Sequence, residues 1–422
     1  MARILFTTFG SHGDLHPYLA VGRELKRRGH EVTIATSASH RASVEAECIT
    51  FHPVRPDIAL DDRALLEQIF DRRRGTERVV RMIGSRIRET YEDTRPVVEG
   101  ADLVVTHLSS VAAVAIVEKL GKPWVSTVLA PAAFLSAYDP PVPAVASWIV
   151  KARVFGPAFM RRIWAVARQV SLGWVQDVIE FRREIGLSTA EHPLFEGAYS
   201  PKLVLAMFSR HFAAPAPDWP PKVNVTGFPF YCGRSPAPQD LLRFMEFGPA
   251  PIVFTLGSSA VGAAGSFYKD SVEVVGRLGA RAVFLTGSFP QDLSSNLPAD
   301  VFVAQYAPHS EMFPRAAAIV HQGGIGTTAQ ALRSGRPMLV VPFAHDQYDN
   351  AARVRRLGAG EMLPRPRYTV AAATKRLRKL LENPAYTQTA AALGDQVRAE
   401  DGVAACADAI ESCVHIAPRH HS

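Results

Sequence analysis

The chain has 422 residues, of which 47% are apolar, and its 47 basic and 40 acidic side chains give a net charge of +7. This length exceeds one ordinary hydrophobic core, so two domains are expected. The charge suits anionic ligands or membrane surfaces, whereas a nucleic-acid partner is excluded because no basic stripe with interleaved aromatic residues is present.

The first half of the chain alternates short apolar runs with helical patterns. Residues 3–9 form an apolar run, residues 10–13 a turn rich in glycine, residues 17–28 an amphipathic pattern and residues 31–36 a second apolar run. This order predicts a strand, a helix starting near Pro17 and a parallel strand, which is the doubly wound β-α-β unit. Further strands are expected at 103–106 and 124–128, with a helix between them.

Two segments of this half are rich in basic residues. Residues 63–94 form an arginine-rich helical pattern around Arg72-Arg73-Arg74, which we expect to be a solvated helix face. Residues 137–174 are proline-rich at first and then mix aromatic with basic residues in amphipathic segments. Most of these aromatic residues are expected in the core, and the alternatives are an acceptor cleft or a peripheral contact with a membrane surface.

A proline-dense stretch separates the two halves. Nine prolines fall between residues 213 and 251, a density that does not support continuous regular elements. After it the pattern restarts, with a strand at 252–256, a glycine turn and a helix at 267–278. The strand, glycine turn and helix that begin the chain therefore occur a second time. We therefore predict two similar α/β domains, divided as 1–232, a linker at 233–250, 251–395, and a last helix with a tail at 396–422.

The run from Ile319 to Thr328 carries the clearest chemical signal. An apolar strand ends at His321, three glycines follow within four positions, and Thr327-Thr328 open a helix. A helix start with free backbone N–H groups and close-packing glycines favours a phosphate. The next strand ends at Asp346-Gln347, which can grip neighbouring hydroxyl groups. A phosphate cradle followed by a hydroxyl clip predicts a nucleotide-sugar site.

This run, together with Tyr306-Ala307-Pro308-His309 upstream, closely resembles the donor-binding signature of family-1, two-domain (GT-B) glycosyltransferases, particularly the bacterial branch with sterol, antibiotic and rhamnosyl transferases. The resemblance implies two Rossmann-like, doubly wound parallel-sheet domains facing across a cleft. The first domain would bind the acceptor and the second the donor, and the last helix would cross back onto the first domain.

The resemblance also assigns donor-side roles. Tyr306 stacks on the nucleobase, beside Ala307 and His309, His321 meets the diphosphate, and Asp346 with Gln347 holds the sugar hydroxyls. The phosphate turn and cradle comprise Gly257, Ser258, Gly323, Gly324, Gly326, Thr327 and Thr328. The ribose-binding glutamate of plant members is missing, since Ala329 and Gln330 stand there.

The first turn, Gly10 to Pro17, resembles the family's Gly-Ser-Arg-Gly-Asp turn and supplies the candidate bases. Asp14 aligns with the proposed catalytic aspartate, while His12 replaces the arginine and has the better intrinsic pKa for a base at neutral pH. We place Asp14 first and expect His16 to be a plain helix-start residue. Plant members support their base with an aspartate where this chain has His107, which either hydrogen-bonds Asp14 or is structural. Gly13 and Phe134 are assigned to the acceptor side.

The expected reaction is inverting, metal-independent hexosyl transfer from a UDP- or dTDP-sugar, with UDP-glucose slightly preferred to dTDP-rhamnose. The acceptor would be a hydroxyl group of a small hydrophobic molecule such as a phenolic, polyketide, sterol or lipid. No cofactor is expected beyond this co-substrate, and no metal site, because no Asp-x-Asp pair stands near a plausible cleft. The rivals are a nucleotide-sugar 2-epimerase and a non-catalytic sugar-binding protein, whereas an NAD-dependent oxidoreductase lacks its glycine fingerprint here.

Four widely spread cysteines and the absence of an apolar span or a secretory signal pattern fit a cytoplasmic protein, expected as a monomer or homodimer.

Overall fold

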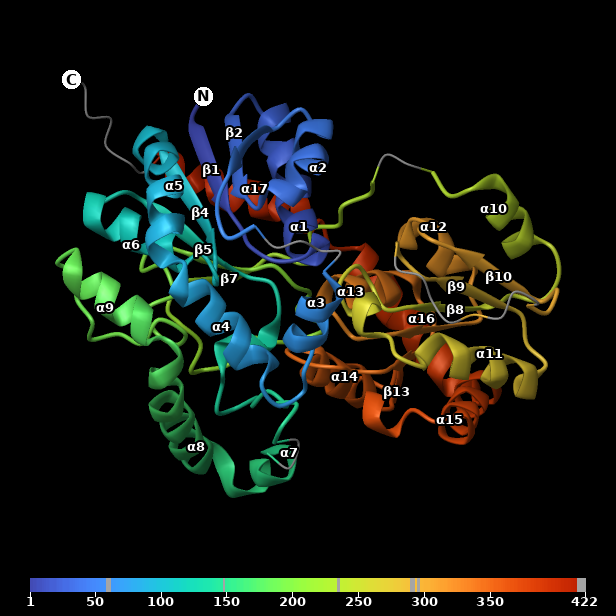
Figure 1. Ribbon diagram of the computed structural model, residues 1–422. Coiled ribbons are helices and arrows are strands. Elements are labelled where there is room, and N and C mark those ends of the chain that lie inside the picture. Colours follow the sequence, from blue (N-terminus) through green and yellow to red (C-terminus); the bar gives the residue numbers. More distant parts are fainter. Residues whose placement is uncertain (58–61, 147–148, 234–235, 289–292, 294–296, 416–422) are drawn as a thin grey trace.

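The computed structural model describes residues 1–57, 62–146, 149–233, 236–288, 293 and 297–415, and shows two α/β units beside each other (Figure 1). Each unit contains one all-parallel sheet covered by helices on both faces, which confirms the predicted pair of doubly wound domains. The sheets have seven strands in the order β3-β2-β1-β4-β5-β6-β7 and six strands in the order β10-β9-β8-β11-β12-β13.

The strands are short, and their side chains are mostly buried because helices cover both faces of each sheet. The first sheet consists of β1 (Arg3–Thr7), β2 (Glu31–Thr36), β3 (Thr50–Pro53), β4 (Leu103–His107), β5 (Trp124–Val128), β6 (Val204–Ala206) and β7 (Val223–Val225). The second consists of β8 (Ile252–Thr255), β9 (Ala282–Leu285), β10 (Val301–Ala304), β11 (Ala318–His321), β12 (Met338–Val340) and β13 (Gly360–Met362).

The helices of the first unit are α1 (His12–Arg27), α2 (Arg41–Ala46), α3 (Arg63–Ile69), α4 (Gly75–Ser85), α5 (Ile87–Gly100), α6 (Val111–Leu120), α7 (Ile149–Ala152), α8 (Gly156–Ser171) and α9 (Gln176–Glu184). Those that follow are α10 (Gln239–Glu246), α11 (Phe267–Leu278), α12 (His309–Met312), α13 (Ile325–Ser334), α14 (Gln347–Arg356), α15 (Val370–Glu382), α16 (Pro384–Arg398) and α17 (Gly402–His415). Short 3-10 turns are η1 (Ala38–His40), η2 (Pro131–Phe134), η3 (Arg153–Phe155), η4 (Leu172–Trp174), η5 (Ala260–Ala263), η6 (Phe313–Arg315) and η7 (Arg365–Arg367).

Alternate side chains along a strand pack into separate hydrophobic cores on the two faces of the sheet. In β1, Ile4 and Phe6 pack with α1 and α17, whereas Leu5 packs with α5 and α6 on the other face. In the second sheet, one core joins the strands to α13, α14 and α16, and the other joins them to α11 and α15. Within the described ranges, no helix combines the length and the apolarity that a bilayer crossing requires.

Helix α1 begins at His12, five residues earlier than Pro17 suggested. Ser11 is its N-cap and forms a capping box with Asp14, because the Ser11 side chain accepts from the Gly13 backbone and the Asp14 carboxylate accepts from the Ser11 backbone. This cap starts the helix directly after the glycine turn, and Pro17 stays inside the helix. His12, Gly13 and Asp14 therefore belong to the first turn of helix α1.

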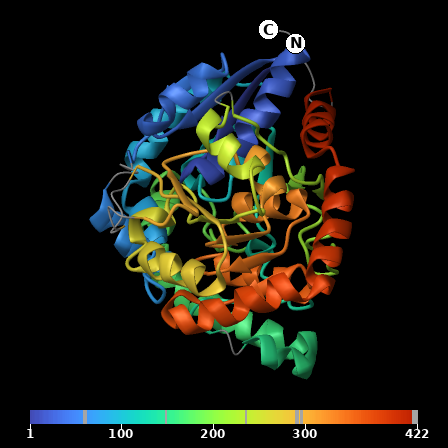
Figure 2. The ribbon, with the colours of Figure 1, turned by 90° about the vertical axis from the view of Figure 1, so that its right-hand side faces the viewer.

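The segments between and after the two sheets are more ordered than the proline content suggested. Part of the stretch expected to be a linker folds as α10, while residues 234–235 of that stretch lie outside the described residues. The last helix, expected from residue 396, begins at Gly402, because α16 extends to Arg398. This helix, α17, packs against α1 of the first unit. Arg28 pairs there with Asp408 at 2.6 Å and Glu411 at 2.7 Å. Figure 2 shows α15, α16 and α17 following one side of the molecule from the second sheet to the first. Of the predicted tail, residues 416–422 are outside the described part.

Candidate active site

A cavity of about 1250 Å³ lies between the two sheets and is lined by both units. The strand orders reverse between β1 and β4 and between β8 and β11, and the carboxyl ends of these strands open toward the cavity. Such a switch point is where doubly wound sheets bind ligands. Fourteen of the residues predicted for the site line this cavity, namely His12, Gly13, Asp14, His107, Gly257, Ser258, Tyr306, Ala307, His309, Gly324, Gly326, Thr327, Asp346 and Gln347.

The turn after β1 holds Asp14 in one orientation. Its Oδ2 atom accepts from the Ser11 backbone N–H at 2.7 Å and lies 3.1 Å from the Ser11 hydroxyl. Gly10 has a φ of +134°, and a Cβ there would lie 2.3 Å from Asp14 Oδ2, so only glycine permits this close approach. The capping contacts occupy Oδ2 and leave Oδ1 as the oxygen that faces His107.

His107, at the end of β4, points its Nε2 atom at Asp14 Oδ1 across 3.9 Å. Its Nδ1 atom accepts from the Ser109 backbone N–H at 3.2 Å. Because Nδ1 is an acceptor, the proton of the neutral ring is on Nε2, toward the carboxylate. Burial lowers the pKa of His107, and the charge of Asp14 opposes that effect. Of the two roles expected for His107, the structure shows a ring oriented toward Asp14 without a direct hydrogen bond.

His12 belongs to a histidine cluster in the cavity wall. Its ring stacks on His16 with centroids 5.6 Å apart and meets His40 at 5.2 Å. Burial, with a smaller contribution from His40, lowers the pKa of His12, so the ring is neutral at pH 7. His16 was expected to be a plain helix-start residue, but it lines the cavity and packs against Tyr231 at 4.8 Å. Burial lowers the pKa of His16 to about 3.

On the opposite wall, the phosphate turn of β8 and the helix start of α13 meet. Gly257 has a φ of +67°, and a Cβ on it would lie 2.3 Å from Gln322 Nε2. Helix α13 begins after Gly324, which provides no side-chain cap, and Gly324, Gly326 and Thr327 line the cavity. The helix therefore presents uncapped N–H groups and the positive end of its dipole to the cavity, as an anion site requires.

Three residues of the predicted donor cradle lie behind this wall. His321 is fully buried, its Nδ1 accepts from the Gly323 backbone at 3.1 Å, and its Nε2 lies 3.4 Å from Met338 Sδ. Burial lowers its pKa to about 3. The expected contact of His321 with a diphosphate is therefore corrected, because the ring instead fixes the glycine turn from behind. Gly323 and Thr328 are likewise absent from the lining, and Thr328 donates its hydroxyl to the Gly324 carbonyl at 3.0 Å.

Phe134 is a second correction. It was assigned to the acceptor side, but the structure places it in the core, where its ring stacks on Trp219 with centroids 4.2 Å apart. An aromatic residue after a strand end gives no sequence signal that separates these two positions. An apolar wall of the cavity comes instead from α3, its C-cap and α4, through Leu66, Ile69, Phe70, Val79, Met82 and Ile83.

The polar pair after β12, Asp346 and Gln347, is held by neighbouring groups of the same segment. Gln347 Oε1 accepts from the N–H groups of Phe343 at 2.9 Å and Ala344 at 3.1 Å, which leaves its amide NH₂ group to face the cavity side. Asp346 Oδ2 accepts from Asn350 Nδ2 at 2.7 Å. Burial raises the pKa of Asp346 to about 7. This carboxyl group can thus donate as well as accept near neutral pH.

Comparisons with known proteins agree with this geometry. The family model described as the glycosyltransferase family 28 N-terminal domain matches residues 4–138, and that described as the erythromycin biosynthesis protein CIII-like C-terminal domain matches residues 271–412. O-mycaminosyltylonolide 6-deoxyallosyltransferase of Streptomyces fradiae is 32% identical over 95% of both chains. The chain belongs to the family-1-like glycosyltransferases of GT-B form.

Other similar proteins place this glycosyltransferase in the same fold. A sterol 3-beta-glucosyltransferase of Leptosphaeria maculans is 29% identical over 94% of this chain, which spans only 28% of that longer protein. Among solved structures, the calicheamicin glycosyltransferase CalG4 superposes with a TM-score of 0.74 at 18% identity over 99% of both chains. The glycosyltransferase VinC in complex with DTDP gives 0.72 at 20% identity over 98% of this chain and all of that one.

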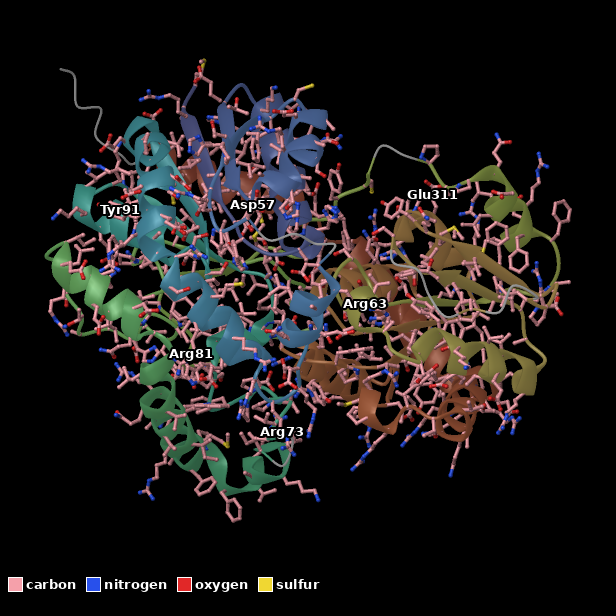
Figure 3. All side chains as sticks on the ribbon, in the orientation of Figure 1. Asp57, Arg63, Arg73, Arg81, Tyr91 and Glu311 are labelled. Carbon is pink, nitrogen blue, oxygen red and sulfur yellow. The ribbon has the colours of Figure 1, made fainter. Side chains whose placement is uncertain are left out.

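Several residues that line the cavity of the glycosyltransferase were not predicted from the sequence. Gln322 reaches across to Gly257, and its Oε1 atom is buried without a hydrogen-bond partner among the described residues. A polar residue inside the glycine run was a signal that could have identified it. Tyr231 lines the cavity from a proline-rich segment, and Ala38 and Ser39 line it from the 3-10 turn η1, where the sequence carries no recognisable motif. Figure 3 shows the labelled Asp57, another lining residue, on the first unit.

Proposed function

We propose that this glycosyltransferase transfers a hexose, with inversion, from a UDP- or dTDP-sugar to a hydroxyl group of a small hydrophobic acceptor. One observation carries the proposal: Asp14, the uncapped start of α13 and the apolar wall of α3 and α4 all line a single cavity. A base, an anion site and a surface for an apolar molecule are the parts that this reaction needs.

In the proposed reaction, Asp14 Oδ1 takes the proton of the acceptor hydroxyl group as that oxygen bonds to the anomeric carbon. The bond from that carbon to the diphosphate oxygen breaks on the opposite face, so the configuration inverts. The backbone N–H groups and dipole of α13 stabilise the departing negative charge in place of a cation. Metal-independence is part of the proposal, and unchanged initial rates after EDTA treatment are its test.

Asp14 is preferred to His12 because of its contacts. Its Oδ2 is fixed by Ser11, while its Oδ1 faces the imidazole N–H of His107. At 3.9 Å that N–H group does not hydrogen-bond Oδ1, but its dipole stabilises the charge of the carboxylate without competing for the proton. His12 instead packs among other histidines, and its Nδ1 atom is buried without a hydrogen-bond partner in the described structure.

For the donor we keep UDP-glucose slightly ahead of dTDP-rhamnose. Tyr306, which is 59% exposed at the cavity, offers a stacking face that accepts uracil or thymine. Asp346 and Gln347 then recognise the sugar by hydrogen bonds to its hydroxyl groups. A donor that lacks one hydroxyl group would lose about 1–3 kcal/mol of binding free energy if a buried acceptor were left unpaired. The names of relatives include a 6-deoxy sugar and glucose, since one is a 6-deoxyallosyltransferase and the other a glucosyltransferase.

The deciding experiment incubates the protein with each radiolabelled donor, with and without a phenolic or lipid alcohol. Label that moves to the alcohol, only when the alcohol is present, supports the proposal. Formation of an epimeric nucleotide-sugar without acceptor, or binding without any turnover, would assign the site to the epimerase or the binding protein. Calorimetric titration of both donors into wild type and Asp346→Ala then tests sugar recognition, because equal affinities unaffected by the substitution would remove Asp346 from it.

The division at residues 1–232, 233–250, 251–395 and 396–422, the cytoplasmic location and the monomeric or homodimeric state are retained as part of this proposal. They rest on the composition and on the family resemblance.

A further inference from the structure

The outer face of α7, η3 and α8 is apolar and basic, and no other element in the described part of the chain covers it. Its apolar members include Val154 at 82% exposure, Phe155 at 68% and Val166 at 64%. The full set, called the α8 face below, comprises Val150, Lys151, Val154, Phe155, Phe159, Arg162, Val166 and Val170. Scattered exposed apolar residues need no explanation, but a contiguous set marks an interaction site.

The arrangement along α8 shows that this face is distinct from the face that packs on the protein. Met160 is fully buried and packs with Ala137, Ile149 and Ala152, while the Trp164 indole donates to the Ser136 carbonyl at 3.3 Å. Another set, Phe155, Phe159, Arg162, Val166 and Val170, recurs every three or four residues and forms one solvent-side stripe. The helix is therefore apolar on both sides, although only one side has a partner among the described residues.

The positive charge of residues 149–171 indicates that the partner of this face is anionic. Residues 149–171 contain five basic residues and no acidic residue. Arg153 and Arg168 pair with carboxylates outside the segment, at 3.4 Å and 3.2 Å, but Lys151 and Arg162 have no ion pair among the described residues. Two copies of this face would bring like charges together, which disfavours self-association. Exposed aromatic and aliphatic side chains between unpaired cations suit an anionic lipid surface.

The position in the fold allows such contact. Figure 1 shows α7 and α8 at the lower edge of the molecule, and Figure 2 shows the same green segment protruding at the bottom after the turn of view. The Arg72 guanidinium donates to the Ala144 carbonyl at 3.1 Å, so the exposed Arg72-Arg73-Arg74 group borders the loop that leads into α7. Figure 3 shows the labelled Arg73 on this lower side. This cationic group extends the basic surface beside the α8 face.

We propose that the α8 face docks the enzyme onto the surface of an anionic phospholipid bilayer. The apolar side chains enter the boundary between headgroups and acyl chains, and Lys151, Arg162 and the arginine group contact lipid phosphates. This docking is independent of the proposed reaction, because it is measured without donor or acceptor.

The experiment is sedimentation of the full chain with vesicles of phosphatidylcholine alone or mixed equally with phosphatidylglycerol. Wild type should partition into the anionic vesicles at least about tenfold more strongly, and high salt should weaken the binding. Phe155→Ser/Phe159→Ser and Lys151→Gln/Arg162→Gln should each reduce partitioning about tenfold or more. Phe247→Ser is the matched control, since Phe247 is 73% exposed beyond the end of α10 and should bind as wild type does.

Thermal unfolding confirms that each variant is folded, and the charge pair keeps the test valid if the aromatic pair misfolds. Equal partitioning of wild type into both kinds of vesicle would overturn the proposal. Unchanged binding by both double variants would also overturn it, as would a wild-type dimer that the Phe155→Ser/Phe159→Ser change dissociates, which would assign the face to a second copy.

Discussion

The Nε2 atom of His107 lies 3.9 Å from Oδ1 of Asp14, and the other nitrogen of that ring accepts from the Ser109 backbone. The imidazole is therefore fixed as an N–H donor beside the carboxylate. This reverses the plant arrangement implied by the family resemblance, in which a carboxylate supports a histidine base. In the reaction proposed above, the histidine would lie beside a carboxylate base.

We predict that Asp14→Asn lowers turnover by about 10²–10⁴-fold, because it removes the base. Asparagine keeps an oxygen that can accept from the Ser11 backbone, so the cap of α1 and the affinity for UDP should be preserved. His12→Ala should slow the reaction less. Initial rates and calorimetric titration with UDP check this, and near-normal turnover of Asp14→Asn with a slow His12→Ala would reverse the two roles.

A second prediction concerns Gly257, where a side chain would collide with Gln322 Nε2. Gly257→Ala should weaken UDP binding about tenfold or more, equivalent to about 1.4 kcal/mol, since Gln322 must leave the wall beside the phosphate turn. Gly279→Ala is the matched control. Gly279 has a similar φ of +59°, but a Cβ added there would meet nothing within 4 Å, so this variant should lose roughly 1–2 kcal/mol of stability and no affinity. Equal affinities of the two variants would show that the contact with Gln322 is irrelevant to binding.

A third prediction concerns Arg353, which joins the two units. Its buried guanidinium contacts Asp349 Oδ2 at 2.6 Å within α14 and Asp139 Oδ2 at 2.5 Å in the first unit. Arg353→Met would leave the buried Asp349 without its counter-charge and should cost about 3–5 kcal/mol in the free energy of unfolding. The exposed Arg355 on the same helix is the control, and Arg355→Met should change stability by less than about 0.5 kcal/mol. Urea unfolding of the two variants checks this, and similar midpoints would contradict it.

The sequence predicted most of the fold because its signals are local. Apolar runs followed by glycine turns marked β1 and β8, and the glycine run after His321 marked the start of α13. The failures concern three-dimensional packing. His321 and Thr328 belong to the correct motif, but their side chains turn behind the wall, which spacing along the chain does not reveal.

The remaining parts of the site are assembled from distant segments. The histidine cluster joins residues of α1 to His40, and the apolar wall comes from the part of the chain noted only for its arginines. In α3 and α4 the arginines do face solvent, but the opposite side of the same helices lines the cavity. A charge pattern identifies one face of a helix, whereas the partner of the other face depends on tertiary structure.

The last prediction is a pH effect on stability at Asp346. Burial raises the pKa of this carboxyl group from 3.8 to about 7, so the folded state binds the proton more tightly than the unfolded state. The resulting stabilisation is fully present below pH 3.8 and is lost as the pH rises through 7. Asp346→Asn cannot lose a proton there. Its stability relative to wild type should therefore increase between pH 5 and pH 8, by up to about 3 kcal/mol.

Urea unfolding of wild type and Asp346→Asn at these two pH values measures the difference directly. Asp300→Asn is the control, because Asp300 is an exposed carboxylate of the same unit and its removal should leave the pH dependence of wild type unchanged. A constant difference between wild type and Asp346→Asn across this range would mean that Asp346 is already ionised in the folded protein at pH 5. The Asp346 carboxylate could then only accept hydrogen bonds from the sugar. In the proposed recognition of the sugar hydroxyl groups, the amide NH₂ group of Gln347 would be the hydrogen-bond donor.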